Sequence, residues 1–339
     1  MPQDITVAFA PHTRKPLSTQ RIMLDVIIGL IPAVIAAGVY FRSDGLMLIG
    51  ITVAWCMAAE WTCNVIRKRP SSLWDLSAVV TGVILALSLP PGLPLWAAAI
   101  GAVFAIAIGK MVFGGLGANI FNPAMAGRAF LTASFGLLMT TWIVPATIDP
   151  NQPKVAPTNN LYDIRTQATP LAWSKIAIKD ENGAGIYSER HPLWSGLLGE
   201  EPGCLGETSA LALLLGGLYL LIRRTINIHL PLSVLLSAFV FAAIAYFVDP
   251  DSYVQPFYHL TSGALLLGAF FIATDPVTAP LTVRGQWIFG AIIGGFTMLV
   301  RVVGEYPEGF MYAVLLANSV RPLLDRFLRP VPVGGVPNA

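Results

Sequence analysis

Long apolar runs alternate with short polar stretches along most of this chain, and one longer polar stretch divides the runs into two groups. The hydrocarbon core of a bilayer is about 30 Å thick, so a membrane-spanning helix needs roughly 20 apolar residues. A transmembrane barrel would require strict alternation of polarity, which these runs lack. The pattern therefore predicts ten membrane-spanning helices, five on each side of the polar stretch, in runs that begin near residues 22, 45, 77, 93, 122, 207, 230, 260, 286 and 308.

The third run of each group is short and ends in a proline-rich break. The first begins near residue 77, includes residues 81–85 and breaks at 90–94. The second begins near residue 260, includes residues 262–266 and breaks at 275–280. Helices of about 12 to 15 residues reach only roughly 18 to 22 Å, so we expect both to end inside the protein. Because they are the third and the eighth of the ten helices, they run in opposite directions, and matched broken helices in inverted halves point to a site at the midplane. The alternative is that the prolines simply end two helices at the membrane surface.

The composition also indicates a membrane protein. Of the 339 residues, 55% are hydrophobic and 12% are charged, whereas about a quarter of the residues of a typical soluble domain are charged. The formal net charge of +2 gives no reason to expect nucleic acid as a partner. The three cysteines and four histidines are scattered over different runs and loops, so they form no pattern of metal ligands.

The positive charges indicate the orientation of the helices, because cytoplasmic connections carry an excess of Lys and Arg. The connections at one end of the spans hold most of the basic residues, and those at the other end hold Arg42 and little else that is basic. We therefore expect both termini in the cytoplasm of a bacterial cell and the polar middle segment on the periplasmic side of the inner membrane. The cytoplasmic set is Arg14, Lys15, Arg21, Arg67, Lys68, Arg69, Lys110, Arg223, Arg224, Arg284, Arg326 and Arg329.

These features divide the chain into four parts. Residues 1–141 form a first membrane repeat, 142–206 a periplasmic segment, 207–329 a second membrane repeat and 330–339 a cytoplasmic tail. The predicted fold class is an all-α integral membrane protein with an extracytoplasmic segment between its two halves.

Ionisable side chains within apolar runs are costly, which makes them candidates for function. Glu60 and Asp275 are the best placed to line a polar path for ions through the membrane. The alternative is structural, because Asp25 and Glu60 near the cytoplasmic rim could extend to water or pair with Arg21 and Arg67.

The polar middle segment contains the stretch Asp163-Ile164-Arg165-Thr166-Gln167-Ala168-Thr169-Pro170-Leu171. A threonine displayed there, outside the lipid, can carry a group that the buried helices could not easily admit. Taken alone, Thr169 in an exposed turn before a proline is ordinarily just a turn residue.

Several ordered stretches together resemble one known family, and they cover essentially the whole chain. This is the NqrB/RnfD family of membrane subunits of ion-translocating redox complexes. The chain is more similar to the Rnf branch of the family, because it lacks the longer N-terminal extension of the Nqr branch. The stretches that carry the resemblance are residues 11–13, 114–130, 206–209, 259–263, 273–277 and 317–320.

The resemblance implies ten helices in two inverted five-helix repeats of a urea-transporter-like fold. It also implies FMN attached through its phosphate to a threonine in a Ser/Thr-x-Ala-Thr motif on the extracytoplasmic segment. Here the motif runs from Thr166 to Thr169 and puts the phosphoester on Thr169, although its second position, often a small residue, is Gln167. Arg165 would then offset the phosphate charge and Asp163 would fix the turn. A second, non-covalent flavin such as riboflavin is a further expectation.

The expected function is that of a redox subunit of an Rnf-type ferredoxin:NAD oxidoreductase, which relays electrons through FMN while Na⁺ or H⁺ crosses the membrane. Flavin accepts two electrons and can pass on one, and the protein supplies orientation and tuning. The chain is not expected to be catalytic alone, so its partners are other subunits of the Rnf complex, a flavin transferase for maturation and the lipid bilayer. The rival is a cofactor-free channel or solute transporter of the same inverted fold, which would not need a long external segment with an Ala-Thr acceptor. A third possibility is a scaffold protein that has lost its flavin, which only the departure at Gln167 supports.

Overall fold

The computed structural model describes residues 18–143, 168–178, 183–190, 192–199 and 201–328. Within these ranges the regular elements are helices and there is no β-strand. Each of the ten apolar runs found in the sequence is helical over part of its length. The all-α class is therefore confirmed for the described part of the chain.

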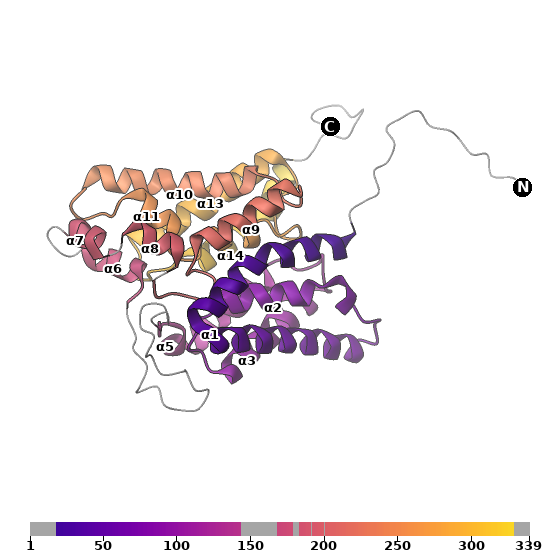
Figure 1. Ribbon diagram of the computed structural model, residues 1–339. Coiled ribbons are helices and arrows are strands. Elements are labelled where there is room, and N and C mark those ends of the chain that lie inside the picture. Colours follow the sequence, from indigo (N-terminus) through magenta and orange to yellow (C-terminus); the bar gives the residue numbers. More distant parts are fainter. Residues whose placement is uncertain (1–17, 144–167, 179–182, 191, 200, 329–339) are drawn as a thin grey trace, which may run out of the picture.

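The first group of runs forms a bundle that is drawn in indigo and purple in Figure 1. Its longest element, α1 (Thr19–Ile66), is interrupted at Arg42, where φ is 55° and ψ is −141°. The chain reverses there, so α1 consists of two helices that correspond to the first two predicted runs. The other elements of this bundle are η1 (Leu73–Asp75), α2 (Ser77–Leu87), α3 (Leu95–Ile106), the π-helical turn η2 (Ala107–Met111), α4 (Pro123–Ser134) and α5 (Gly136–Met139).

The second group of runs forms a second bundle, in which α10 packs on α13 and α13 packs on α14. Contacts of α1 with α9 and of α4 with α14 join the two bundles. The elements of this bundle are α9 (Ala210–Ile222), α10 (His229–Val248), α11 (Pro256–Thr261), α12 (Leu265–Leu267), the π-helical turn η4 (Gly268–Ile272), α13 (Val283–Val302) and α14 (Phe310–Phe327).

Three short helices of the middle segment lie together at one end of the molecule (Figure 1). They are α6 (Pro170–Ala177), α7 (Gly183–Arg190) and α8 (Leu193–Leu198). The start of α1 and the end of α14 lie at the other end of the molecule, which we call the terminal face. The end that holds α6, α7, α8 and α11 is called the opposite face.

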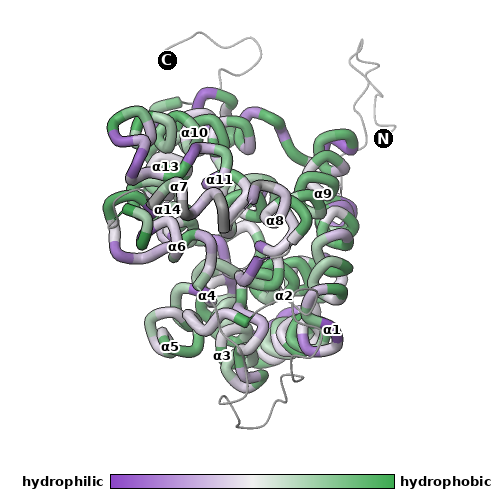
Figure 2. The backbone as a smooth tube through the Cα atoms, turned by 60° about the vertical axis from the view of Figure 1, so that its left-hand side comes forward, coloured by the Kyte–Doolittle hydropathy of each residue, from purple (hydrophilic) through white to green (hydrophobic). Residues whose placement is uncertain are grey.

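The surface of the helices is that of a membrane protein. By length and composition α1, α10 and α13 are able to cross a bilayer. Large apolar side chains point outward, with Ile35 60% and Ile244 59% exposed, whereas soluble proteins rarely expose large apolar patches. Figure 2 shows hydrophobic residues along α1, α3, α9 and α10, and hydrophilic residues mainly at helix ends and loops. The number of spans and their inverted arrangement stay predictions.

The two short runs correspond to α2 and to the segment formed by α12 and η4. As predicted, α2 ends inside the protein, where Leu87 and Leu89 are completely buried. The second segment likewise ends inside the protein, because Ile272 is completely buried and Ala273 is only 1% exposed. Asp275 and Pro276, which follow this end, line an open cavity.

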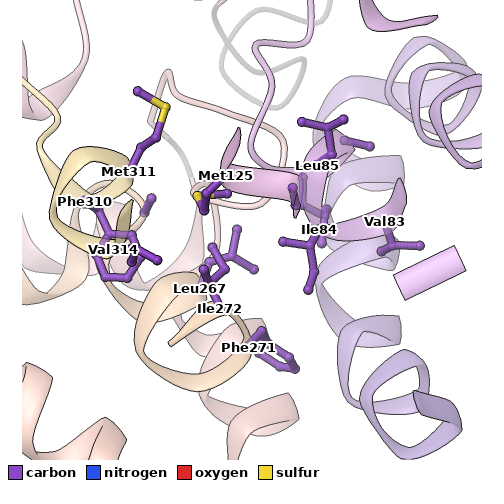
Figure 3. Close-up of a cluster of buried hydrophobic side chains, with 14 of the residues drawn as sticks. Val83, Ile84, Leu85, Met125, Leu267, Phe271, Ile272, Phe310, Met311 and Val314 are labelled. Atoms are coloured by element: carbon purple, nitrogen blue, oxygen red, sulfur yellow. The ribbon is translucent and has the colours of Figure 1, made fainter. Parts of the chain in front are cut away.

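The two short segments are antiparallel neighbours at the centre of the molecule. Ser77 at the start of α2 and Thr274 just after η4 line the same cavity. At their other ends, an ideal Cβ on Gly206 would lie 2.8 Å from Leu87 Cβ and 3.3 Å from Leu267 Cδ2. Figure 3 shows their side chains in one buried cluster with residues of α4 and α14, in which Val83, Ile84, Leu85, Met125, Leu267, Phe271, Ile272, Phe310, Met311 and Val314 are labelled.

Two glycines allow α1 and α9 to cross at very short range. A Cβ on Gly216 would collide with the carbonyl oxygen of Gly29. Small residues at a helix crossing let the backbones approach, which is how helices associate tightly in membranes. The junction of the two bundles therefore depends on the absence of a side chain at Gly216.

We predict that Gly216→Ala separates α1 from α9 and lowers the midpoint of thermal unfolding in detergent. Overpacking of this kind costs about 1–3 kcal/mol. Gly295→Ala is the matched control, because a Cβ at this helical position of α13 meets no atom within 4 Å. Its midpoint should stay unchanged or rise slightly, since Ala favours a helix more than Gly does. Equal midpoints for the two variants would contradict the close crossing.

Candidate functional site

Thr169 begins helix α6 and is buried. Its Oγ1 accepts a hydrogen bond from the amide of Ala172 at 3.2 Å, which makes it the N-cap. Pro170 occupies the first helical position, where its missing N–H costs no hydrogen bond. Thr169 is only 7% exposed, so the prediction that it lies in an exposed turn is wrong. The apolar residues that follow, such as Leu171, turn the stretch into a helix that packs on the protein.

Helix α6 is held in place at its other end. Lys175 donates hydrogen bonds to the carbonyl oxygens of Val300, at 3.1 Å, and Gly304, at the end of α13. Beside it, Tyr187 of α7 packs edge-on against Tyr258 of α11, with the ring centroids 5.2 Å apart. Burial, together with the nearby Glu201 carboxylate, raises the pKa of Tyr187, so its hydroxyl stays neutral. The position of Thr169 is therefore fixed by two further helices.

A cavity of about 450 Å³ opens beside Thr169 at the opposite face. We call it the Thr169 cavity. Glycine and proline residues form part of its wall, and most of its polar groups are carboxylates and hydroxyls. Its lining includes Trp142, Thr169, Glu201, Glu207, Thr208 and Glu308.

Each of the three carboxylates of the Thr169 cavity has a partner. Arg128 Nη2 lies 3.6 Å from Glu207 Oε1, and Arg301 Nη2 lies 3.3 Å from Glu308 Oε1. The hydroxyl of Ser195 donates to Glu201. A buried charge is tolerated when it is paired and hydrogen-bonded, and two buried guanidinium groups thus offset two of the three negative charges.

Of the residues assigned to the flavin site from the sequence, Thr169 is described by the structure. Asp163, Arg165 and Thr166 lie outside the described residues, and their roles stay predictions. Glu201, Glu207 and Glu308 were not assigned to this site, although the structure brings all three to its cavity. Glu207 and Glu308 could have been recognised in the sequence, because each lies at the start of an apolar run, where a charged side chain is costly.

A second cavity, of about 680 Å³, lies toward the terminal face, and we call it the Lys110 cavity. Lys110 Nζ donates to Glu60 Oε2 at 2.8 Å and to Ser77 Oγ at 2.5 Å. The hydroxyl of Ser72 donates to the other oxygen of Glu60. The Glu60 side chain is completely buried and that of Lys110 is 2% exposed. The polar lining of this cavity comprises Ser77, Thr81, Lys110, Asn119, Asn122, Thr225, Thr274 and Asp275.

Asp275 and Glu60, the two candidate ion-path residues, differ in how they relate to this cavity. Asp275 lines the cavity directly and accepts hydrogen bonds from the amide of Val277 at 3.1 Å and the hydroxyl of Thr278 at 3.2 Å. Glu60 is reached only through its ion pair with Lys110. Their role as a polar path through the membrane stays a prediction.

Asp25 and Glu60 of α1 form ion pairs, as the structural alternative predicted, but their partners are not Arg21 and Arg67. Glu60 pairs with Lys110 rather than Arg67, whose guanidinium donates to a backbone carbonyl. Asp25 lies 3.3 Å from Arg223, not beside Arg21 on its own helix. Lys110, counted above among the charges of the cytoplasmic connections, is buried in the last turn of its helix. Such partners lie on helices that are far apart in the sequence, so spacing alone could not reveal them.

Comparisons with known proteins give one consistent answer. The family model described as NQR2, RnfD, RnfE family matches residues 6–334. A subunit of the Na(+)-translocating ferredoxin:NAD(+) oxidoreductase complex of Acetobacterium woodii is 42% identical over 327 residues, which cover 96% of this chain and 94% of that protein. A subunit of the ion-translocating oxidoreductase complex of Yersinia pseudotuberculosis is 39% identical over 344 residues, covering 96% and 97%. Its namesake from Pectobacterium atrosepticum is 39% identical over 345 residues, with the same coverage.

We predict that Lys110→Met strongly destabilises the protein, because it leaves the Glu60 carboxylate buried without its cation. Breaking a buried pair in this way costs about 3–5 kcal/mol, which would be seen as a lower thermal midpoint in detergent. The double variant with Glu60→Gln should recover much of the loss. Arg321→Met is the control, since it breaks a half-exposed pair with Asp325 that is worth about 0.3–0.5 kcal/mol. Equal effects of the two Met variants would refute the structural role of the buried pair.

Proposed function

Because the chain belongs to the NQR2, RnfD, RnfE family, we propose that it is the FMN-carrying membrane subunit of an Rnf-type, ion-translocating ferredoxin:NAD oxidoreductase. In this role it relays electrons while Na⁺ or H⁺ crosses the membrane, and it does not catalyse the whole reaction alone. The names of its relatives support the ion-translocating oxidoreductase complex, and one of them specifies Na⁺, ferredoxin and NAD⁺. The single observation that carries the flavin proposal is the Thr169 hydroxyl at the wall of a cavity.

The surroundings of Thr169 fit a phosphoester. Its oxygen lies at the N-terminus of α6, where the helix dipole favours negative charge. Arg128 and Arg301 offset two nearby carboxylates, which reduces the repulsion that a phosphate would meet. Thr169 would hold the group covalently, and the backbone of α6 would orient it. When bound, FMN supplies the exchange between two-electron and one-electron transfer.

The proposed topology is two inverted five-helix repeats of a urea-transporter-like fold, with the terminal face in the cytoplasm of a bacterial cell and α6, α7 and α8 in the periplasm. The antiparallel course of α2 and the α12–η4 segment supports this arrangement, since matched broken helices are typical of inverted repeats. Arg21 and Arg223 lie at the helix ends of the terminal face, as cytoplasmic ends require. The Thr169 cavity would then open on the periplasmic side.

We assign the second, non-covalent flavin, such as riboflavin, to the Lys110 cavity. The cavity is concave and mostly apolar, with a few polar groups in its wall, which is the usual make-up of a small-molecule site. Ser77, Asn119 and Thr274 offer hydrogen-bonding groups among apolar walls. Asp275 is the carboxylate that faces this cavity, and it is a better ion-path candidate than Glu60, whose charge is already offset by Lys110.

The partners follow from the same proposal. Electrons must come from and go to other subunits of the Rnf complex, and a flavin transferase must attach FMN to Thr169. The exposed apolar side chains of α1 and α10 suit contact with lipid or with membrane subunits.

We predict that the purified wild-type protein, from its native host, fluoresces in a denaturing gel under ultraviolet light and that Thr169→Ala does not. Thr169→Ser should keep both the N-cap and an acceptor hydroxyl, and so retain fluorescence, whereas loss of the cap in the Ala variant alone costs only about 1 kcal/mol. Thr261→Ala, which removes another hydroxyl from the same cavity, should fluoresce like wild type. If wild type does not fluoresce, FMN attachment is wrong and the cofactor-free channel or transporter is favoured.

A further inference from the structure

A helix break lies directly beside the first turn of α6. Between α11 and α12 the chain passes through Gly263 with a φ of +73°, a conformation that glycine adopts without strain. A Cβ at Gly263 would collide with Leu171 of α6 and with the side chains of Arg301 and Glu308. Gly263, Glu308 and Thr169 all line the Thr169 cavity. The break is thus in contact with the helix that begins at Thr169.

Arg301 and Glu308 hold the two sides of this break with opposite charges. Arg301, which is 1% exposed, donates to the carbonyl oxygens of His259 at 2.6 Å and Ser262 at 3.1 Å, at the end of α11. Glu308 accepts from the amide of Ala264 at 3.0 Å, just beyond the break. The two side chains form an ion pair at 3.3 Å. Each charge therefore also satisfies backbone groups that the break leaves free.

Glu308 also reaches a third element. Its Oε1 accepts a hydrogen bond from the amide of Phe310, the first residue of α14. Its side chain is 14% exposed, whereas that of Arg301 is fully buried. The carboxylate is consequently the member of the pair that faces the Thr169 cavity, and the guanidinium lies behind it.

We propose that Glu308, held by Arg301, is a positioning residue of the flavin site that sets the reduction potential of the cofactor on Thr169 and links its charge to the helix break at Gly263. This inference rests on the proposed attachment of FMN to Thr169. It names the place where a change in the redox state of the cofactor acts on the helical core.

The physical reason is charge repulsion in a weakly screened space. Each electron that the isoalloxazine accepts, from a partner redox centre or from a chemical reductant that is oxidised in exchange, adds one negative charge unless a proton follows. Charges near a protein interior interact several times more strongly than in water. Arg301 offsets only part of this repulsion, because the Glu308 carboxylate lines the cavity and the guanidinium lies behind it, so the carboxylate disfavours the added charge and lowers the reduction potential. The added charge in turn repels the Glu308 carboxylate and weakens the hydrogen bond that it accepts from the amide of Ala264.

The first test is a redox titration of the covalent flavin in the purified complex, followed by visible absorbance, with the spectrum of Thr169→Ala subtracted to remove any other flavin. We expect Glu308→Gln to shift the potential to a more positive value. Glu305→Gln is the matched control, because Glu305 is an exposed carboxylate three residues away, and its potential should equal that of wild type. An unchanged potential in Glu308→Gln would overturn the inference.

The second test needs no change at Glu308 and decides the matter if that variant does not accumulate. Amide hydrogen exchange is compared between the oxidised and the dithionite-reduced complex for peptides that cover residues 259–268. We expect faster exchange on reduction in wild type and no change in Thr169→Ala. Identical exchange in both redox states of wild type overturns the inference. Absence of covalent flavin from wild type would instead refute the proposed function, so the two failures are distinguishable.

Discussion

The compensation of buried charge is the constraint on which this helical core depends. Side chains with little or no exposure form ion pairs in this core, namely Lys110 with Glu60, Arg128 with Glu207 and Arg301 with Glu308. An isolated charge in such surroundings would cost several kcal/mol. Two of these pairs border the Thr169 cavity and one borders the Lys110 cavity, so the same interactions that allow charges inside the protein also shape its two cavities.

The polar groups of the backbone also need partners inside the protein. Broken helices expose amide and carbonyl groups that lipid cannot satisfy, and the structure provides internal partners for them. At the end of α2, the carbonyl oxygens of Leu87 and Leu89 accept hydrogen bonds from the amides of Gly206 and Leu205. At Gly263, the ion pair of Arg301 and Glu308 provides the partners. Short helices can therefore meet at the centre of the molecule, and the second break is placed next to the threonine proposed to carry FMN.

The sequence predicted the broad features of the fold well, because they follow from the length and polarity of each run. Every apolar run is helical over part of its length, and the short third run of each half ends inside the protein. The charge pairs could not be predicted, since Glu60 and Lys110 are separated by 50 residues and only tertiary packing brings them together. The burial of Thr169 was missed for a similar reason. A Thr-Pro pair begins helices and turns alike, and only the contacts of α6 with α13 distinguish the two.

The central claim is that Thr169 carries FMN through a phosphoester, and mass spectrometry tests it most directly. Trypsin cleavage after Arg165 and Lys175 gives a peptide of residues 166–175 that contains both threonines of the motif. In protein from the native host, we expect this peptide to carry the mass of FMN less one water, with fragment ions that place it on Thr169 and not on Thr166. An unmodified peptide from such material would contradict the account.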